Sequence, residues 1–367
     1  MDIALTKWLQ KFKEILYTIE DFDKQDTYYY MPKTSLYIRG STTLMQYMYI
    51  TREKRTGSYK VIRNSIILFE FLYFKIVSLF KLSNLKIILP ASESYFSIFI
   101  GNHRIRLTSI LFDNDLVIDL TEPRPNFNRN SASVGDGIFS SISPHQCVMD
   151  DECRIISEER FSGVAINRLA SNLIKETEIT FISDYRHLIF KNMKNISTNS
   201  FVDNIRTTVF NSSFQKQLND VANEYELTEF NVLVADFFEI LCFSGPDKVT
   251  ISTSHRDLNR GNVLACEGFN FRVIDWEFLG SAYYNYDMFI FLSNYRHSQD
   301  FGVSWKRYIE ESNRFGIQIH EYEVLIFCLE EIVFFVDNYS VREWKNIRDF
   351  KVLVNSLIHA RKIFYAS

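Results

Sequence analysis

The sequence predicts an α+β protein in which a small β-rich part precedes a larger helical part. The chain has 367 residues and is 46% hydrophobic, which is enough to fill a sizeable core. Short runs rich in β-branched and aromatic residues dominate residues 86–157, whereas long apolar helical patterns dominate residues 165–245 and 300–367. The order of these patterns indicates two lobes of unequal size.

Residues 1–85 are expected to form an N-terminal extension packed on the lobe that follows. The first 24 residues carry Lys, Glu and Asp throughout, which predicts an amphipathic helix and not a secretory signal. Residues 65–82 are mostly apolar, but a glutamate and two lysines interrupt the run well short of the ~20 apolar residues that span a bilayer. We expect a helix buried on most faces there, with a membrane-surface helix as the alternative.

Residues 86–157 are predicted to form the β-rich lobe, as an antiparallel meander. Its strand-like runs alternate with turns and are "KIILPA", "YFSIFIG", "RIRLTSILF" and "LVIDLTE". The second lobe, residues 158–367, is predicted to be helical except for a short strand pair near residue 255. The segment from Phe230 to Phe243 predicts a helix whose apolar residues cover more than one face.

Charge and cysteine usage limit the classes of partner. The 41 basic and 45 acidic residues give a formal net charge of −4 and are spread through the chain, so no basic stripe indicates nucleic acid. The five cysteines are odd in number and widely spaced, without a Cys-x-x-Cys pair or histidines at metal-ligand spacing. This pattern favours a reduced, cytoplasmic protein.

One polar segment stands out, "HRDLNRGNVL" from His255 to Leu264, followed by "RVIDWEF" from Arg272 to Phe278. Phosphoryl transfer from a nucleotide needs a carboxylate to orient and deprotonate the acceptor hydroxyl, and hard oxygen ligands to hold Mg²⁺. Asp257, Asn262 and Asp275 are the right residue types for these tasks. A surface turn rich in Asp and Asn is the structural alternative for such a short motif.

These two segments closely resemble the catalytic segment of the aminoglycoside phosphotransferase and choline kinase family, protein-kinase-like enzymes that phosphorylate small molecules and sugars. Protein kinases use a related H-R-D-L-x-x-x-N loop and a D-F-G. Trp276 and Glu277 follow the second aspartate, which favours the small-molecule branch. The resemblance implies a two-lobed protein-kinase-like fold, with the nucleotide-binding lobe at residues 86–157 and the catalytic and acceptor-binding lobe at residues 158–367.

The resemblance also implies ATP and Mg²⁺ as cofactors and a role for each matched residue. Asp257 corresponds to the catalytic base, and Asn262 and Asp275 to the Mg²⁺ ligands. His255 corresponds to a residue that stabilises the loop and need not touch substrate. Asp287, in the continuation "SAYYNYDMFIFL", is expected to be structural, through hydrogen bonds to the loop.

A hinge that binds adenine is predicted where an apolar strand runs into Glu159, Arg160 and Phe161 and then into Gly163. The segment resembles the family's hinge, whose main-chain groups hydrogen-bond the adenine. A plain strand-to-helix turn is the alternative interpretation of the same residues.

The lysine with which the family grips the phosphates is missing from the predicted third strand, "LVIDLTEP", which has Asp119 near the expected position. Three replacements are open. Arg106 would reach the site from the second strand, or Arg124 would turn back from beyond the third. In the third case the lobe begins earlier and uses Lys60 or Arg63. Arginine can bind phosphate bidentately but is not equivalent to lysine.

The acceptor is less defined than the loop. In the C-terminal helices, acidic residues would suit an amine, and the aromatic residues beside them would suit a sugar or a quaternary ammonium group. A helical charge run is usually a solvated face, so aminoglycoside, choline and sugar acceptors all stay open. These acidic residues are Glu321, Glu323, Glu330, Glu331 and Asp337. Two associations favour a carbohydrate: a low-Pro, low-Gly bias common in genes of bacterial surface-polysaccharide clusters, and an extension longer than a minimal antibiotic or choline kinase needs.

Two functions are compatible with the sequence. The first is an ATP- and Mg²⁺-dependent kinase that phosphorylates a hydroxyl of a small molecule or carbohydrate, which the presence of Asp257, Asn262 and Asp275 favours. The second is a catalytically impaired relative that binds nucleotide or a protein partner without turnover, which the missing lysine favours.

Overall fold

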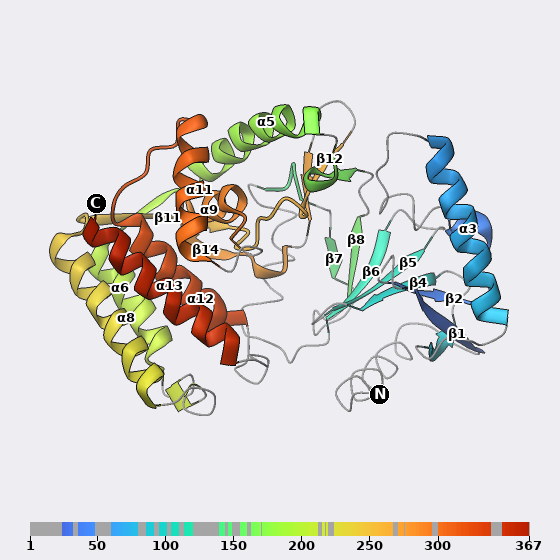
Figure 1. Ribbon diagram of the computed structural model, residues 1–367, viewed down its shortest axis with the longest axis horizontal. Coiled ribbons are helices and arrows are strands. Elements are labelled where there is room, and N and C mark those ends of the chain that lie inside the picture. The colour runs from blue at the N-terminus through green and yellow to red at the C-terminus, as the bar shows by residue number, and fades with distance from the viewer. Residues whose placement is uncertain are drawn as a thin grey trace. The chain divides into compact units, whose positions relative to one another are not determined.

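The chain forms two compact units in the computed structural model (Figure 1). The first comprises residues 1–174 and 264–274, and the second residues 175–263 and 275–367. The amphipathic helix predicted for the N-terminus lies outside the residues that the structure describes. These are residues 24–31, 36–47, 60–79, 86–91, 95–100, 104–109, 114–119, 139–143, 146–148, 155–159, 163–169, 171–211, 215–216, 218, 224–266, 271–274, 276–295, 300–338 and 347–366.

The first unit holds an antiparallel sheet with eight described strands. They are β1 (Lys24–Met31), β2 (Leu36–Arg39), β3 (Lys86–Ala91), β4 (Tyr95–Ile100), β5 (Arg104–Ser109), β6 (Asn114–Asp119), β7 (Gln146–Val148) and β8 (Ile155–Glu159). Their order across the sheet is β3-β1-β2-β4-β5-β6-β8-β7. The predicted meander is present as β4, β5 and β6, which pair in sequence.

Strands β1 and β2 come from the segment that the sequence assigns to an extension. They lie between β3 and β4 in the sheet, and β1 pairs with both of its neighbours through Tyr28, which faces Arg39 of β2 and Ile87 of β3. This segment therefore shares the sheet with the strands after residue 86. The domain boundaries at 85/86 and 157/158 stay predictions.

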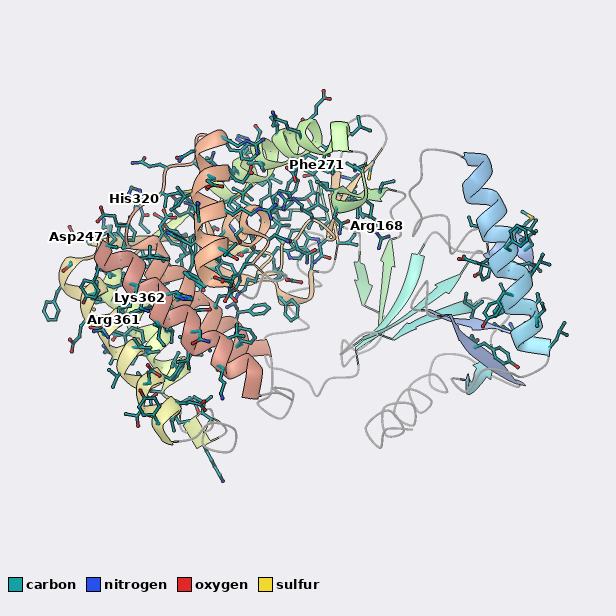
Figure 2. All side chains as sticks on the ribbon, in the orientation of Figure 1. Arg168, Asp247, Phe271, His320, Arg361 and Lys362 are labelled. Atoms are coloured by element: carbon teal, nitrogen blue, oxygen red, sulfur yellow. The ribbon has the colours of Figure 1, made fainter. Side chains whose placement is uncertain are left out.

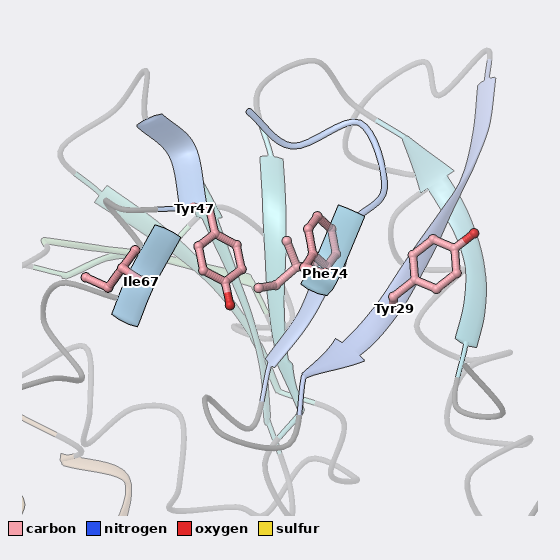
Figure 3. Packing of buried hydrophobic residues seen from close by; sticks show 5 residues of the cluster. Tyr29, Tyr47, Ile67 and Phe74 are labelled. Carbon is pink, nitrogen blue, oxygen red and sulfur yellow. The ribbon is translucent and has the colours of Figure 1, made fainter. Parts of the chain in front are cut away.

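Helix α3 (Lys60–Leu79) packs one of its faces at the β1–β2 end of the sheet (Figure 1). Its Ile67 and Phe74 join Tyr29, Ile38 and Tyr47 in a buried cluster (Figure 3). The rings of Tyr47 and Phe74 stack with centroids 5.7 Å apart. The helix thus contributes two of the five buried residues of this cluster.

The opposite face of α3 corrects the expectation of a helix buried on most faces. Phe69, Tyr73 and Leu79 are 72%, 62% and 75% exposed. Apolar residues on every face of a helix do not reveal which face a sheet will cover, since periodicity needs polar positions to define a side. Among the described residues, no helix combines the length and apolarity needed to cross a bilayer.

A second, smaller sheet has the order β13-β12-β9. Its strands are β9 (Val164–Ala165), β12 (Val263–Ala265) and β13 (Phe271–Val273). Gly163, in the predicted hinge, precedes β9, which continues into η1 (Ile166–Arg168). A Cβ on Gly163 would lie 3.0 Å from both the carbonyl oxygen of Ala265 and the Cβ of Leu264. The glycine thus permits the close approach of these two strands.

The second unit is mostly helical around the sheet β10-β11-β14. Its elements are α5 (Ser171–Phe190), β10 (Lys194–Ser197), α6 (Thr198–Val209), α8 (Glu224–Ser244), β11 (Lys248–Ser254), η3 (Trp276–Phe278), β14 (Gly280–Tyr283), α9 (Tyr286–Ser293), α11 (Phe301–Arg314), α12 (Glu323–Asn338) and α13 (Ile347–Ala366). The β-rich first unit and the helical second unit confirm the predicted α+β class, with its small β-rich part first and its larger helical part second.

Helix α8 shows why the helices of the second unit could be predicted from the sequence. It packs against α6 and α13. Its buried residues recur every three or four positions and are Phe230, Leu233, Val234, Phe237, Phe238 and Leu241. This is the spacing of one wide helical face, and the predicted helix from Phe230 to Phe243 is confirmed.

We expect Phe74→Ala to lower the free energy of unfolding by about 3–5 kcal/mol, because it opens a cavity in the α3 cluster. The side chain is fully buried. The matched control is Phe69→Ala on the exposed face of the same helix, which should change stability by less than about 0.5 kcal/mol. Urea denaturation measures both. Equal effects of the two substitutions would contradict the packing of α3 on β1 and β2.

Candidate active site

The polar loop follows strand β11 and begins at His255. Asp257 and Asn262, the predicted base and metal ligand, lie side by side in it, and both are partly exposed. The Asn262 side-chain Nδ2 donates to the backbone oxygen of Asp257 at 2.9 Å and lies 3.4 Å from its Oδ2. Since Nδ2 is used within the loop, Oδ1 is the atom of Asn262 suited to a metal ion.

The carboxylate of Asp287, in the first turn of α9, holds the start of the loop through hydrogen bonds. Its Oδ2 accepts the backbone N–H of His255 at 2.8 Å, and its Oδ1 accepts that of Arg256 at 2.8 Å. The hydroxyl of Tyr185 on α5 donates to Oδ2 at 2.7 Å. All four residues are buried. The structural role expected for Asp287 is confirmed by these hydrogen bonds.

Arg256 adopts a left-handed backbone conformation, with φ of 65°. This region costs an L-residue roughly 1–2 kcal/mol, so the surroundings must hold it. Besides the bond to Asp287, its N–H lies 3.2 Å from Oγ of Ser254, and its guanidinium carbon lies 5.7 Å from the centre of the Phe334 ring. A Cβ on Gly280 would lie 3.3 Å from Cδ of Arg256, so this glycine makes room for the arginine.

His255 supports the loop from within and is fully buried. Its Nδ1 accepts the backbone N–H of Asp257 at 3.3 Å. Its ring lies 4.7 Å, centroid to centroid, from that of the buried Trp276. Trp276, the residue that favoured the small-molecule branch, therefore packs against the histidine that orients Asp257.

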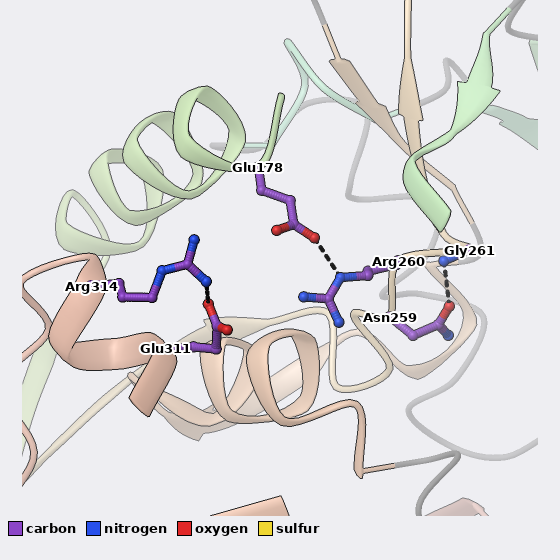
Figure 4. A network of polar contacts seen from close by, with 6 residues as sticks. All are labelled: Glu178, Asn259, Arg260, Gly261, Glu311 and Arg314. Atoms are coloured by element: carbon purple, nitrogen blue, oxygen red, sulfur yellow. Dashed lines mark hydrogen bonds and ion pairs between the residues drawn. The ribbon is translucent and has the colours of Figure 1, made fainter. Parts of the chain in front are cut away.

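A buried ion pair ties the loop to helix α5 (Figure 4). Nε of Arg260 lies 2.5 Å from Oε1 of Glu178, and only 15% and 9% of the two side chains are exposed. The guanidinium also lies 5.3 Å from the centre of the Phe291 ring. Next to it, Oδ1 of Asn259 accepts the N–H of Gly261 at 2.8 Å, closing the turn before Asn262.

Sequence reasoning missed three residues that shape the loop: Tyr185, Arg260 and Glu178. Arg260 lies inside the quoted motif and could have been predicted to form an ion pair, because a buried arginine needs an anionic partner. Tyr185 is 102 positions from Asp287, and nothing in its local sequence distinguishes it from the other apolar-face residues of α5.

Other predicted site residues fall outside this loop. Asp275, Arg160 and Phe161 lie outside the described residues. Arg106 is placed by its backbone on β5, opposite Phe99 and Val117, and Glu159 by its backbone at the end of β8, opposite Asn114. Of the replacements for the missing lysine, Lys60 and Arg63 belong to helix α3 and not to a strand. Arg124 lies outside the described residues.

The chemistry of the loop fits a magnesium ion. Mg²⁺ prefers carboxylate and amide oxygens, and the loop offers the Asn262 amide oxygen next to the Asp257 carboxylate. Within the described part of the chain, no three His, Cys, Asp or Glu side chains gather as a metal cluster. The fit therefore rests on the donor types of Asn262 and, by sequence, of Asp275.

Three of the acidic residues of α12 are buried, so they neither form a solvated face nor lie open to an acceptor. Glu323, Glu330 and Glu331 are buried. Oε1 of Glu330 accepts the backbone N–H of Tyr283 at 2.8 Å, and Glu331 accepts the hydroxyl of Tyr286. Their carboxylates are used inside the unit because α12 packs against β14 and α9.

Glu323 begins α12 and is fully buried. Its Oε1 accepts the hydroxyl of Tyr283 at 3.0 Å and the backbone N–H of His320 at 3.3 Å. Burial raises the pKa of Glu323 to about 7, and these hydrogen bonds only partly oppose the shift. The carboxyl is thus largely protonated in mildly acidic solution.

The chain is similar to solved structures of small-molecule kinases at low sequence identity and at TM-scores below 0.5. No family model matches the sequence, and no curated protein does. Among solved structures, the chain is similar to a choline kinase from Streptococcus pneumoniae, with 11% identity over 73% of this chain and 91% of that one, at a TM-score of 0.46.

Two further structures give the same kind of match. A GDP complex of aminoglycoside 2'-phosphotransferase-IIIa has 9% identity over 75% of this chain and 94% of that one, at a TM-score of 0.46. An ethanolamine kinase from Plasmodium vivax has 13% identity over 89% and 95%, at a TM-score of 0.41. By name, all three belong to the class that the catalytic segment resembles. Because the TM-scores lie below 0.5, the function proposed below is argued from the loop itself.

We expect Tyr185→Phe to lower the free energy of unfolding by about 1–2 kcal/mol, because Asp287 loses one of its three donors while buried. Tyr225→Phe on α8 is the matched control, since that tyrosine is 75% exposed. Urea denaturation of both variants measures the difference. If the two were equally stable, Tyr185 would not support the loop.

Glu323→Gln should remove a pH dependence of stability between about pH 4.5, the ordinary pKa, and about pH 7. The folded state binds this proton more tightly than the unfolded chain, so the stabilisation is full below pH 4.5 and is lost as the pH rises to 7. The loss is up to about 3 kcal/mol.

The control for this variant is Glu321→Gln, at the exposed neighbouring position. Denaturation at several values from pH 4.5 to 8 should show the wild type and the Glu321 variant falling together, and the Glu323 variant staying flatter. Parallel curves for all three proteins would mean that Glu323 titrates normally in the fold.

Proposed function

We propose that the protein is an ATP- and Mg²⁺-dependent phosphotransferase that phosphorylates a hydroxyl of a small molecule or carbohydrate. One observation carries the proposal: the Asp287 carboxylate binds two consecutive loop amides, and the loop so held places Asp257 beside the amide of Asn262. A solvated surface turn has no need of a buried carboxylate beneath it, so the structural alternative for the motif is disfavoured.

Asp257 is the group that acts on the acceptor. Its carboxylate orients the acceptor hydroxyl and takes its proton as the oxygen forms a bond to the γ-phosphorus and the bond to ADP breaks. The buried His255 holds the Asp257 backbone through Nδ1, and Nδ2 of Asn262 lies 3.4 Å from Oδ2 of Asp257, so contacts within the loop position the carboxylate. Such positioning is the main contribution that a protein makes to phosphoryl transfer.

Asn262 and Asp275 would hold Mg²⁺ through oxygen atoms, and the ion, when bound, would neutralise charge on the phosphates. The side chain of Asn262 is already oriented for this role, because its Nδ2 donates to the Asp257 carbonyl. Its Oδ1 points away from that hydrogen bond and is the atom that would bind the ion. We assign adenine binding to the hinge at Glu159, Arg160 and Phe161. Arg106 remains the proposed basic residue for the phosphates.

The acceptor is proposed to be a carbohydrate of bacterial surface-polysaccharide metabolism, and the setting cytoplasmic. The compositional bias and the N-terminal segment support this choice. That segment supplies β1 and β2 to the sheet, so it is an addition built into the fold and not a separable tail. The buried glutamates of α12 do not contribute to acceptor binding in this proposal.

A nucleotide-binding protein without turnover is the second candidate. The specific observation in its favour is that the β6 sequence, Asn114–Asp119, contains no lysine. Its catalytic loop would then be retained for binding alone. The two candidates differ in whether Asp257 is needed for anything other than nucleotide binding.

We expect Asp257→Asn to keep nucleotide binding and to lower phosphoryl transfer by at least about 100-fold, since the base is lost but the loop hydrogen bonds remain. ADP release is measured with Mg²⁺, ATP and pooled hydroxyl acceptors, and binding by the rise in melting temperature with ATP and Mg²⁺. The matched control is Asp203→Asn, an exposed position on α6.

The two readouts separate the candidates. Binding with no transfer by either wild type or variant would support the second candidate. Full transfer by Asp257→Asn would remove Asp257 as the base. The absence of any melting shift at millimolar ATP and Mg²⁺ would contradict both.

A further inference from the structure

A pocket with a volume of about 380 Å³ opens at the start of β11, within the second unit. The size is that of a site for a small molecule. Its lining includes His320, which Figure 2 labels. The lining residues that matter for recognition are Arg186, Lys248, Tyr284, Gln318, His320 and Tyr322.

This pocket is separate from the catalytic loop. It is lined by Lys248 and Thr250 at the beginning of β11, whereas the loop follows Ser254 at the end of the strand. At ~3.3 Å per residue, the strand spans ~13 Å from Thr250, the nearer of these two lining residues, to Ser254, and ~20 Å from Lys248. The pocket therefore does not hold an acceptor beside Asp257.

Two cations give the pocket its charge. Arg186 comes from α5 and Lys248 from β11, and no acidic side chain is among the residues that line it in the described chain. Nε of Arg186 is buried and finds no hydrogen-bond partner among the described residues. The guanidinium lies over the ring of Phe190, 5.1 Å from its centre, which fixes its position. A buried donor without a partner is costly, and a bound anion would satisfy it.

Aromatic rings form another part of the wall. The rings of His320 and Tyr322 stack, with centroids 5.3 Å apart and planes 2° apart. Tyr284 meets the ring of Tyr283 edge-on at 4.9 Å, and its backbone N–H donates to the carbonyl of Thr250. These rings offer flat apolar area beside the two cations, as in sites that bind a ring and an anion together.

We propose that this pocket is a second binding site, for a small organic anion whose phosphate or carboxylate group pairs with Arg186 and Lys248 and whose apolar part lies on Tyr284 and Tyr322. A cationic ligand is disfavoured because Arg186 and Lys248 would repel it. Behind the wall, Glu323 is hydrogen-bonded to the hydroxyl of Tyr283 and is largely protonated below pH 7, so it opposes the anion little in mildly acidic solution. The site does not depend on the proposed phosphotransferase activity.

Calorimetric titration at pH 6 tests the site with four probes. They are phenyl phosphate, benzoate, the neutral phenyl β-glucoside and the cation phenyltrimethylammonium. Wild-type protein should bind phenyl phosphate or benzoate more tightly than the other two. Comparison of the affinities for phenyl phosphate and benzoate shows whether the site prefers a phosphate or a carboxylate.

The variant Arg186→Gln combined with Lys248→Gln should bind the preferred anion at least tenfold more weakly. Lys194→Gln is the matched control, because Lys194 is exposed on the neighbouring strand β10 and does not line the pocket. Lys248→Gln alone should weaken anion binding severalfold. Because Lys248 is exposed, this single variant tests the site if the double variant does not fold. Asp257→Asn should bind the anion as wild type does, which separates this pocket from the catalytic loop.

Three outcomes would overturn the proposal. They are the absence of anion binding, equal affinity of wild type and the Arg186 and Lys248 variants, and tighter binding of the cation or of the neutral glucoside than of both anions.

Discussion

The loop from His255 to Asn262 depends on its hydrogen bonds to the buried carboxylate of Asp287. This carboxylate accepts hydrogen bonds from the consecutive amides of His255 and Arg256 and from the hydroxyl of Tyr185. Each of these two consecutive amides donates to a different oxygen of the one carboxylate. Directly after them, the positive φ of Arg256 changes the direction of the chain, and Asp257 follows.

A charge that is 1% exposed is stable only when its acceptor atoms are filled, because an unpaired buried charge costs several kcal/mol. Asp287 meets this condition with three donors from two separate segments, α5 and the loop. The pair of Arg260 and Glu178 adds a second buried link between the same segments. The loop is thus linked to α5 directly through Arg260 and indirectly through Asp287 of α9, and these buried contacts fix the backbone on either side of Asp257.

The parts of this structure that follow from local pattern were predictable, and those that follow from distant pairing were not. The periodicity of α8 and the residue types of the loop from His255 to Asn262 are local, so the sequence identified both. The place of β1 between β3 and β2 is not local, because a strand's alternation marks its faces and not its neighbours. Tyr185 was missed for the same reason, since its partner is 102 positions away.

The burial of the α12 glutamates could not be predicted from the sequence either. In the sequence they resemble a solvated helical face, yet Glu323, Glu330 and Glu331 are buried against tyrosines of β14 and α9. Hydrogen-bond donors supplied by other elements decide whether an acidic residue can be buried. Such donors cannot be assigned to their acceptors before the fold is known.

The central claim is that a loop held in this way binds a nucleotide through Mg²⁺. Calorimetric titration of ATP into the full chain, with and without Mg²⁺, measures this directly. The arrangement of Asp257 and Asn262 predicts binding that is at least tenfold tighter when Mg²⁺ is present. Equal affinity in its presence and absence, or no heat of binding at millimolar ATP, would contradict the claim.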